Sequence, residues 1–105
     1  MYINTFIENV NNAKTLLATL LKKTLLVEIK PSHSASQLIE LSTNGAKVIS
    51  SSQSNRHFIM EGKTETIEAV LSNQISLKQS ISFGEVTIKG SYRDFLKIDA
   101  IIKLS

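Results

Sequence analysis

The sequence predicts a small fold that combines helices with a largely antiparallel sheet. Apolar residues near the N-terminus recur at three- and four-residue steps, which is the spacing of an amphipathic helix. The middle of the chain alternates between apolar and polar residues, and Asn44-Gly45 joins two alternating runs, which is a strong hairpin signal. The last stretch, Phe83 to Leu104, consists of an alternating strand between two glycines, followed by an apolar helix.

The first predicted element is a helix over residues 3–21. Its polar side is rich in asparagine, whereas a helix that lies on a membrane surface usually carries lysines there. We therefore expect it to pack on the protein's own sheet, with a membrane-surface helix as the alternative. Its apolar positions are Ile3, Phe6, Ile7, Val10, Ala13, Leu17, Leu20 and Leu21.

Four strands are predicted in the first half, as an antiparallel meander. Pro31 and the serine-rich stretch after it end the first strand, because proline cannot donate to a sheet ladder. The strands span Thr24 to Lys30, Ser36 to Ser42, Ala46 to Ser51 and His57 to Glu61, with a polar turn at Gln53 to Asn55.

A short helix is predicted next, with Thr64 as its N-cap and Asn73 at its end in the left-handed conformation. Ile75 to Phe83 fits either a short helix or an ordered loop. Glu85 to Lys89 alternates as a fifth strand, and Gly90 leads from it into the last helix.

The last helix has a capping signal and a wide apolar arc. Ser91 precedes it and Asp94 follows three residues later, an acidic variant of the capping box. The arc contains Phe95, Leu96, Ile98, Ile101, Ile102 and Leu104. A surface this apolar requires a cover, which a sheet, a partner chain or a bound lipid could each provide.

The length and composition are typical of a small soluble domain. The 105 residues suit one domain, 1–105, and no apolar run approaches the length that crosses a bilayer. There is no cysteine and no sign of a secretory signal, so a cytoplasmic location is expected. The net charge of +3 is modest, and Lys22-Lys23 is the only adjacent basic pair. This pattern argues against nucleic-acid binding and leaves room for weak, salt-dependent attraction to an anionic membrane surface.

Catalytic signals are weak. Neither His33 nor His57 has a metal-ligand partner at a useful spacing, so no metal, cofactor or enzymatic activity is predicted. Asp94 and Asp99 flank Lys97 on the last helix and suggest ordinary surface charge. The apolar residues of the second half exceed what two short helices need, which fits either a closed core or an internal apolar pocket.

The order of elements in the second half resembles the sterol carrier protein domain family, the nonspecific lipid-transfer fold. That order is strand, short helix, apolar turn, glycine, apolar strand, glycine and a last helix. Here it runs from His57–Gly62 and Thr64–Leu71 through Gly84 and Gly90 to the segment Asp94-Phe95-Leu96-Lys97-Ile98. Upstream, the hairpin LIELSTNGAKV also resembles the family, so the likeness covers roughly residues 36–104.

The resemblance implies an α+β fold with an N-terminal helix, a five-stranded mostly antiparallel sheet with helices on one face, and a C-terminal apolar helix. It also implies non-enzymatic binding or transfer of a lipid, fatty acyl or sterol-like, in a pocket between sheet and helices. The residues expected to line that pocket are Phe58, Met60, Leu71, Ile75, Leu77, Ile81, Phe83, Phe95 and Ile98. The alternative is an interaction or homodimerisation module of the same fold, with a closed core and no ligand.

Overall fold

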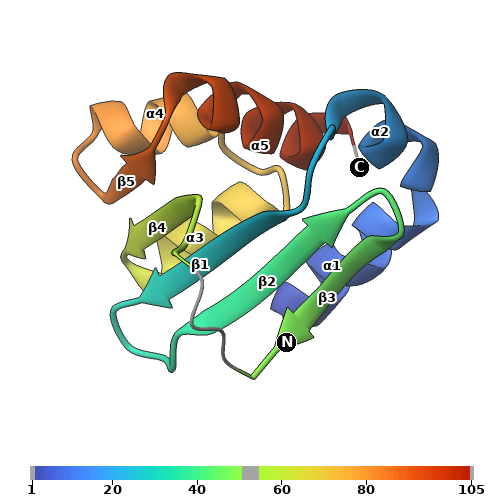
Figure 1. Ribbon diagram of the computed structural model, residues 1–105. Coiled ribbons are helices and arrows are strands. Elements are labelled where there is room, and N and C mark those ends of the chain that lie inside the picture. The colour runs from blue at the N-terminus through green and yellow to red at the C-terminus, as the bar shows by residue number, and fades with distance from the viewer. Residues whose placement is uncertain (1, 51–54, 105) are drawn as a thin grey trace.

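The computed structural model describes residues 2–50 and 55–104, which form one layer of helices on one face of a mixed sheet (Figure 1). The five strands lie in the order β3-β2-β1-β4-β5. They are β1 (Leu25–Pro31), β2 (Gln37–Ser42), β3 (Gly45–Ile49), β4 (Phe58–Gly62) and β5 (Val86–Gly90). The α+β fold class predicted from the sequence is confirmed.

The hairpin predicted around Asn44-Gly45 is present as the antiparallel pair of β2 and β3. Ser42 pairs with Gly45, so Thr43-Asn44 forms the two-residue loop and Gly45 opens β3 with a φ of +126°. The Asn44 N–H donates to the Ser42 hydroxyl at 3.2 Å, which closes the turn locally.

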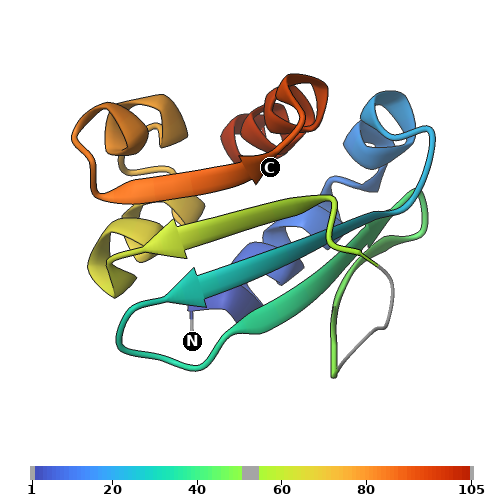
Figure 2. The ribbon, with the colours of Figure 1, turned by 60° about the vertical axis from the view of Figure 1, so that its left-hand side comes forward.

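The predicted four-strand meander is wrong at its fourth strand. β4 does not pair with β3; it returns to the centre of the sheet and lies parallel to β1, with Phe58 opposite Val27 (Figure 2). The other three strand pairs are antiparallel. The polar turn expected at Gln53 to Asn55 lies mostly outside the described residues.

The predicted N-terminal helix is two helices. α1 (Tyr2–Asn12) and α2 (Lys14–Leu20) are separated at Ala13, whose φ of −119° and ψ of 43° are not helical. Asn11, near the end of α1, directs its side-chain amide at the backbone of β3. Its Oδ1 accepts from the Ala46 N–H at 2.7 Å and its Nδ2 donates to the Ala46 carbonyl at 3.0 Å, which ties α1 to β3.

Replacing Asn11 by alanine is expected to lower the free energy of unfolding by about 1–3 kcal/mol, because both backbone groups of the nearly buried Ala46 lose these partners. Urea unfolding followed by circular dichroism measures the change. The exposed neighbour Asn12 provides the matched control, and Asn12→Ala should change stability little. Equal losses for the two variants would contradict the assigned role of the Asn11 amide.

Three further helices complete the helical layer: α3 (Thr64–Leu71), α4 (Leu77–Ser82) and α5 (Tyr92–Leu104). Thr64 is not the N-cap of α3; Lys63 holds that position, and the Thr64 hydroxyl accepts from the His33 N–H at 3.0 Å. Asn73 follows α3 with a φ of +63°, as predicted.

The ambiguous segment after Asn73 contains a helix, α4, which starts with a capping box. The Ser76 hydroxyl accepts from the Gln79 N–H at 3.0 Å, and the Gln79 side chain accepts from the Ser76 N–H. At the start of α5, the Ser91 hydroxyl accepts from the Asp94 N–H at 3.0 Å, which confirms the cap predicted there.

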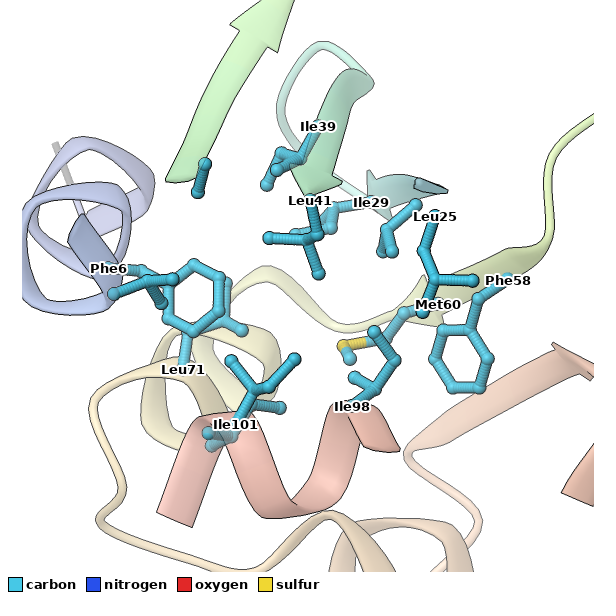
Figure 3. Close-up of a cluster of buried hydrophobic side chains, with 14 of the residues drawn as sticks. Phe6, Leu25, Ile29, Ile39, Leu41, Phe58, Met60, Leu71, Ile98 and Ile101 are labelled. Atoms are coloured by element: carbon cyan, nitrogen blue, oxygen red, sulfur yellow. The ribbon is translucent and has the colours of Figure 1, made fainter. Parts of the chain in front are cut away.

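The core lies between the sheet and the helices (Figure 3). Side chains of the sheet face those of α1, α3 and α5, so the apolar arc of α5 is covered largely by the chain itself. The labelled members are Leu25, Ile29, Ile39, Leu41, Phe58 and Met60 from strands and Phe6, Leu71, Ile98 and Ile101 from helices. The described part of the chain contains no helix with the length and apolar character to cross a bilayer.

Candidate functional site

An open apolar groove of about 510 Å³ lies where α4, β5 and the start of α5 meet. Its apolar lining comes from Ile81 of α4, Ile88 of β5, and Tyr92 and Phe95 of α5. The rings of Tyr92 and Phe95 stack with their centroids 6.1 Å apart. The volume falls in the range of about 300–1,000 Å³ that is usual for small-molecule sites.

Local sequence signals fix the three sides of the groove. The capping box at Ser76 starts α4, and the Ser91 cap starts α5 immediately after β5. Gly90 makes the sharp passage from β5 to α5 with a φ of +149°, a conformation that favours glycine. The rim carries polar groups, namely the ammonium of Lys78 and the hydroxyls of Ser82 and Ser91. An amphipathic ligand fits this arrangement, since apolar and polar surfaces lie side by side.

The space between the sheet and the helices is nearly filled. A cavity of about 10 Å³ remains there, bounded by Met60, Leu71 and Ile98 among others. This is close to the smallest volume that holds one water molecule. An acyl chain would require the helices to move away from the sheet.

The nine residues expected to line a pocket occupy different environments. Ile81 and Phe95 line the groove, and Met60, Leu71 and Ile98 bound the small interior cavity. The remaining four are not in either lining: Phe58 and Leu77 are buried in the core, Ile75 is partly buried against it, and Phe83 is 69% exposed.

Two apolar residues of the groove, Ile88 and Tyr92, were not among the expected lining. Ile88 lies on the inward side of β5, opposite Met60, so the strand alternation could have suggested it. Tyr92 is the first residue of α5 and is 71% exposed, and no periodic pattern distinguishes it from a surface residue.

The acidic residues of α5 are not surface charges, which corrects the interpretation of Asp94 and Asp99. They are 8% and 6% exposed. Asp99 Oδ2 lies 3.2 Å from the Lys103 Nζ, one turn later on the same helix. The outward surface of α5 is consequently more basic than its sequence suggests.

The histidines do not form a reactive centre with these acids. His57 Nδ1 accepts from the Leu26 N–H at 3.0 Å, which fixes the start of β4 against β1. Within residues 2–50 and 55–104 no three His, Cys, Asp or Glu residues gather where they could hold a metal ion.

A second opening of about 580 Å³ lies between α1 and α3, but polar and apolar surfaces contribute nearly equally to it. Tyr2 and Glu68 are among its lining residues, and burial, followed by the charge of Glu68, raises the pKa of Tyr2. Apolar surface predominates in the groove, so the groove is the better candidate for a lipid.

The sequence from residue 3 to residue 103 matches the SCP-2 sterol transfer family. The chain belongs to that family. The resemblance noted from the order of its elements is thereby confirmed, and it extends over the N-terminal helices. A comparison with curated protein sequences finds no significant relative.

Solved structures share the fold at low sequence identity. The UbiJ-SCP2 ubiquinone synthesis protein is 18% identical, with a TM-score of 0.70 over 96% of this chain and 82% of that one. The sterol carrier protein-2 like-3 of Aedes aegypti is 15% identical, with a TM-score of 0.66 over 98% of both chains. The stereoselective inverting sec-alkylsulfatase Pisa1 of Pseudomonas sp. is 11% identical, with a TM-score of 0.71, and the match covers 94% of this chain but 15% of the enzyme. The same fold therefore occurs both as a small protein and as part of an enzyme.

Proposed function

We propose that this protein binds and carries a lipid, without catalysing a reaction, and that the lipid enters through the groove between α4, β5 and α5. The observation that carries the proposal is the apolar lining of that groove by Ile81, Ile88, Tyr92 and Phe95. Membership of a sterol transfer family supports a lipid as the ligand class. Burial of apolar surface would supply the affinity, at about 25 cal/mol for each Å² removed from water.

The polar rim favours a lipid with a head group that can accept hydrogen bonds. Lys78 can donate three hydrogen bonds and carries a positive charge, and the hydroxyls of Ser82 and Ser91 lie on the same rim. A fatty acid has a carboxylate for these donors and an acyl chain for the groove. It is therefore the first ligand to test.

Ile81→Trp is expected to weaken fatty-acid binding by at least tenfold, about 1.4 kcal/mol, because the larger indole would occupy the groove. The readout is displacement of a fluorescent fatty acid, with native mass spectrometry to detect lipid that purifies with the protein. Val48→Trp is the control, because Val48 is a partly exposed residue of β3, at the opposite edge of the sheet from β5. Unchanged binding in Ile81→Trp would exclude the groove as the site.

The alternative is an interaction module with a closed core and no ligand, and the small interior cavity favours it. Native mass spectrometry of the unaltered protein separates the two, because an interaction module with a closed core carries no lipid. Absence of any bound lipid, together with a dimer in sedimentation, would support the interaction module.

A further inference from the structure

The outward surface of α5 combines apolar and basic side chains. We call it the α5 outer face and define it by Tyr92, Arg93, Leu96, Lys97, Ala100, Lys103 and Leu104, which share one side of the helix by their spacing. Tyr92, Leu96 and Leu104 are 71%, 43% and 66% exposed. Packing in the core does not account for large apolar side chains with this much exposure.

The α5 outer face has little exposed negative charge. The acids of α5, Asp94 and Asp99, are both buried. Asp99 contacts only one basic residue of the face, Lys103, at 3.2 Å. Arg93 and Lys97 form no ion pair with any described residue.

The loop before β1 adds two more positive charges. Lys22 and Lys23 line a surface cleft of about 470 Å³ together with Arg93 and Lys97. Neither of these two lysines is in an ion pair within the described residues. In this cleft, four basic side chains therefore face a single acid, Asp94.

The basic cleft adjoins the apolar groove. Ser91 lines both, and Tyr92 lies at the mouth of the groove and at the start of the α5 outer face. Figure 1 shows α4, β5, α5 and α2 along the same side of the molecule. A surface that contacts this side would therefore meet the groove opening, the exposed apolar residues and the four basic side chains together.

We infer that the α5 outer face, with Lys22 and Lys23, docks on an anionic membrane surface. A helix that lies at a membrane surface presents apolar side chains bordered by Lys and Arg, which is the composition of this face. Charge complementarity favours anionic lipid, since each Lys or Arg near such a surface strengthens binding. A nucleic-acid partner would account for the basic residues but not for exposed Leu96 and Leu104. The N-terminal helix does not provide this surface, because Ile3, Phe6 and Val10 of α1 are buried in the core.

Cosedimentation with vesicles of phosphatidylcholine, with and without phosphatidylserine, tests the inference. The protein should bind the phosphatidylserine vesicles more tightly, and added salt should weaken that binding. The double variant Arg93→Gln, Lys97→Gln should bind them about 25-fold more weakly, from about fivefold for each basic residue near the surface. The double variant Leu96→Gln, Leu104→Gln should also lose affinity, because both side chains are exposed apolar contacts.

The matched control is Lys30→Gln, Lys47→Gln, which removes the same charge from two strands of the sheet, β1 and β3. Equal losses in this control and in the Arg93, Lys97 variant would overturn the inference, because charge alone would then govern binding. If the protein bound duplex DNA, and the Leu96→Gln, Leu104→Gln variant bound DNA equally well, the membrane inference would be overturned in favour of a nucleic-acid partner. Binding to phosphatidylserine vesicles without any displacement of the fluorescent fatty acid would support this inference and contradict the lipid-groove proposal, so the two failures can be distinguished.

Discussion

Phe58→Ala is expected to lower the free energy of unfolding by about 3–5 kcal/mol, the usual cost of deleting a buried aromatic ring. The Phe58 side chain is fully buried and lies on β4, which pairs with both β1 and β5. Removal of the ring would leave a cavity. The neighbouring residues could not move to fill this cavity, because β4 is held by strand pairing on both sides. A small protein has a total stability of about 5–15 kcal/mol, so the loss is a large part of it. Urea unfolding of the purified variant measures the change.

Phe83→Ala is the matched control, since it deletes the same ring from a side chain that is 69% exposed. We expect it to change stability by less than about 0.5 kcal/mol. The sequence suggested one role, pocket lining, for both phenylalanines. Similar losses of stability in the two variants would contradict the positions that the structure gives them.

Local patterns predicted the elements of this fold well. Alternation located β1, β2 and β3 to within two residues at each end, and the glycine, strand, glycine order located β5 and α5. These signals are local, because they depend on which side of a strand or helix faces the core. The parallel pairing of β1 with β4 brings together strands that β2 and β3 separate in the sequence, and neither strand's own sequence specifies it.

The candidate site was less accessible to sequence reasoning. Ile81 and Phe83 are two residues apart and both apolar, yet one lines the groove and the other faces solvent. The reason is that Phe83, the C-cap of α4, keeps a helical φ of −79°. Two helical residues turn the side chain by about 200°, so Phe83 lies on the opposite side from Ile81. The burial of Asp94 and Asp99 could not be predicted from the sequence either. A carboxylate at the border of a buried helix face is exposed or buried according to the neighbouring elements.

Gly90→Ala is the second change with a large expected effect. The backbone of Gly90 has a φ of +149°, which an L-residue with a side chain rarely adopts. An added Cβ would also lie 2.8 Å from the His57 carbonyl oxygen and 2.9 Å from Cδ1 of Phe58. Backbone strain and overpacking each cost about 1–3 kcal/mol, so we expect a loss of about 3 kcal/mol or more.

Gly84→Ala is the reference for a positive φ without crowding, because Gly84 has a φ of +74° but no atom within 4 Å of the added Cβ. Its cost should be limited to the backbone term, about 1–2 kcal/mol. Thermal unfolding of both variants measures the difference, which combines the contact of position 90 with Phe58 and His57 and the greater strain of a φ of +149°. Since Gly90 also borders the groove, crowding at this position should weaken fatty-acid binding even where the variant remains folded. If the Gly90→Ala protein were as stable as the Gly84→Ala protein, β4 and β5 would be able to separate at this end. The groove could then change its shape to admit a ligand.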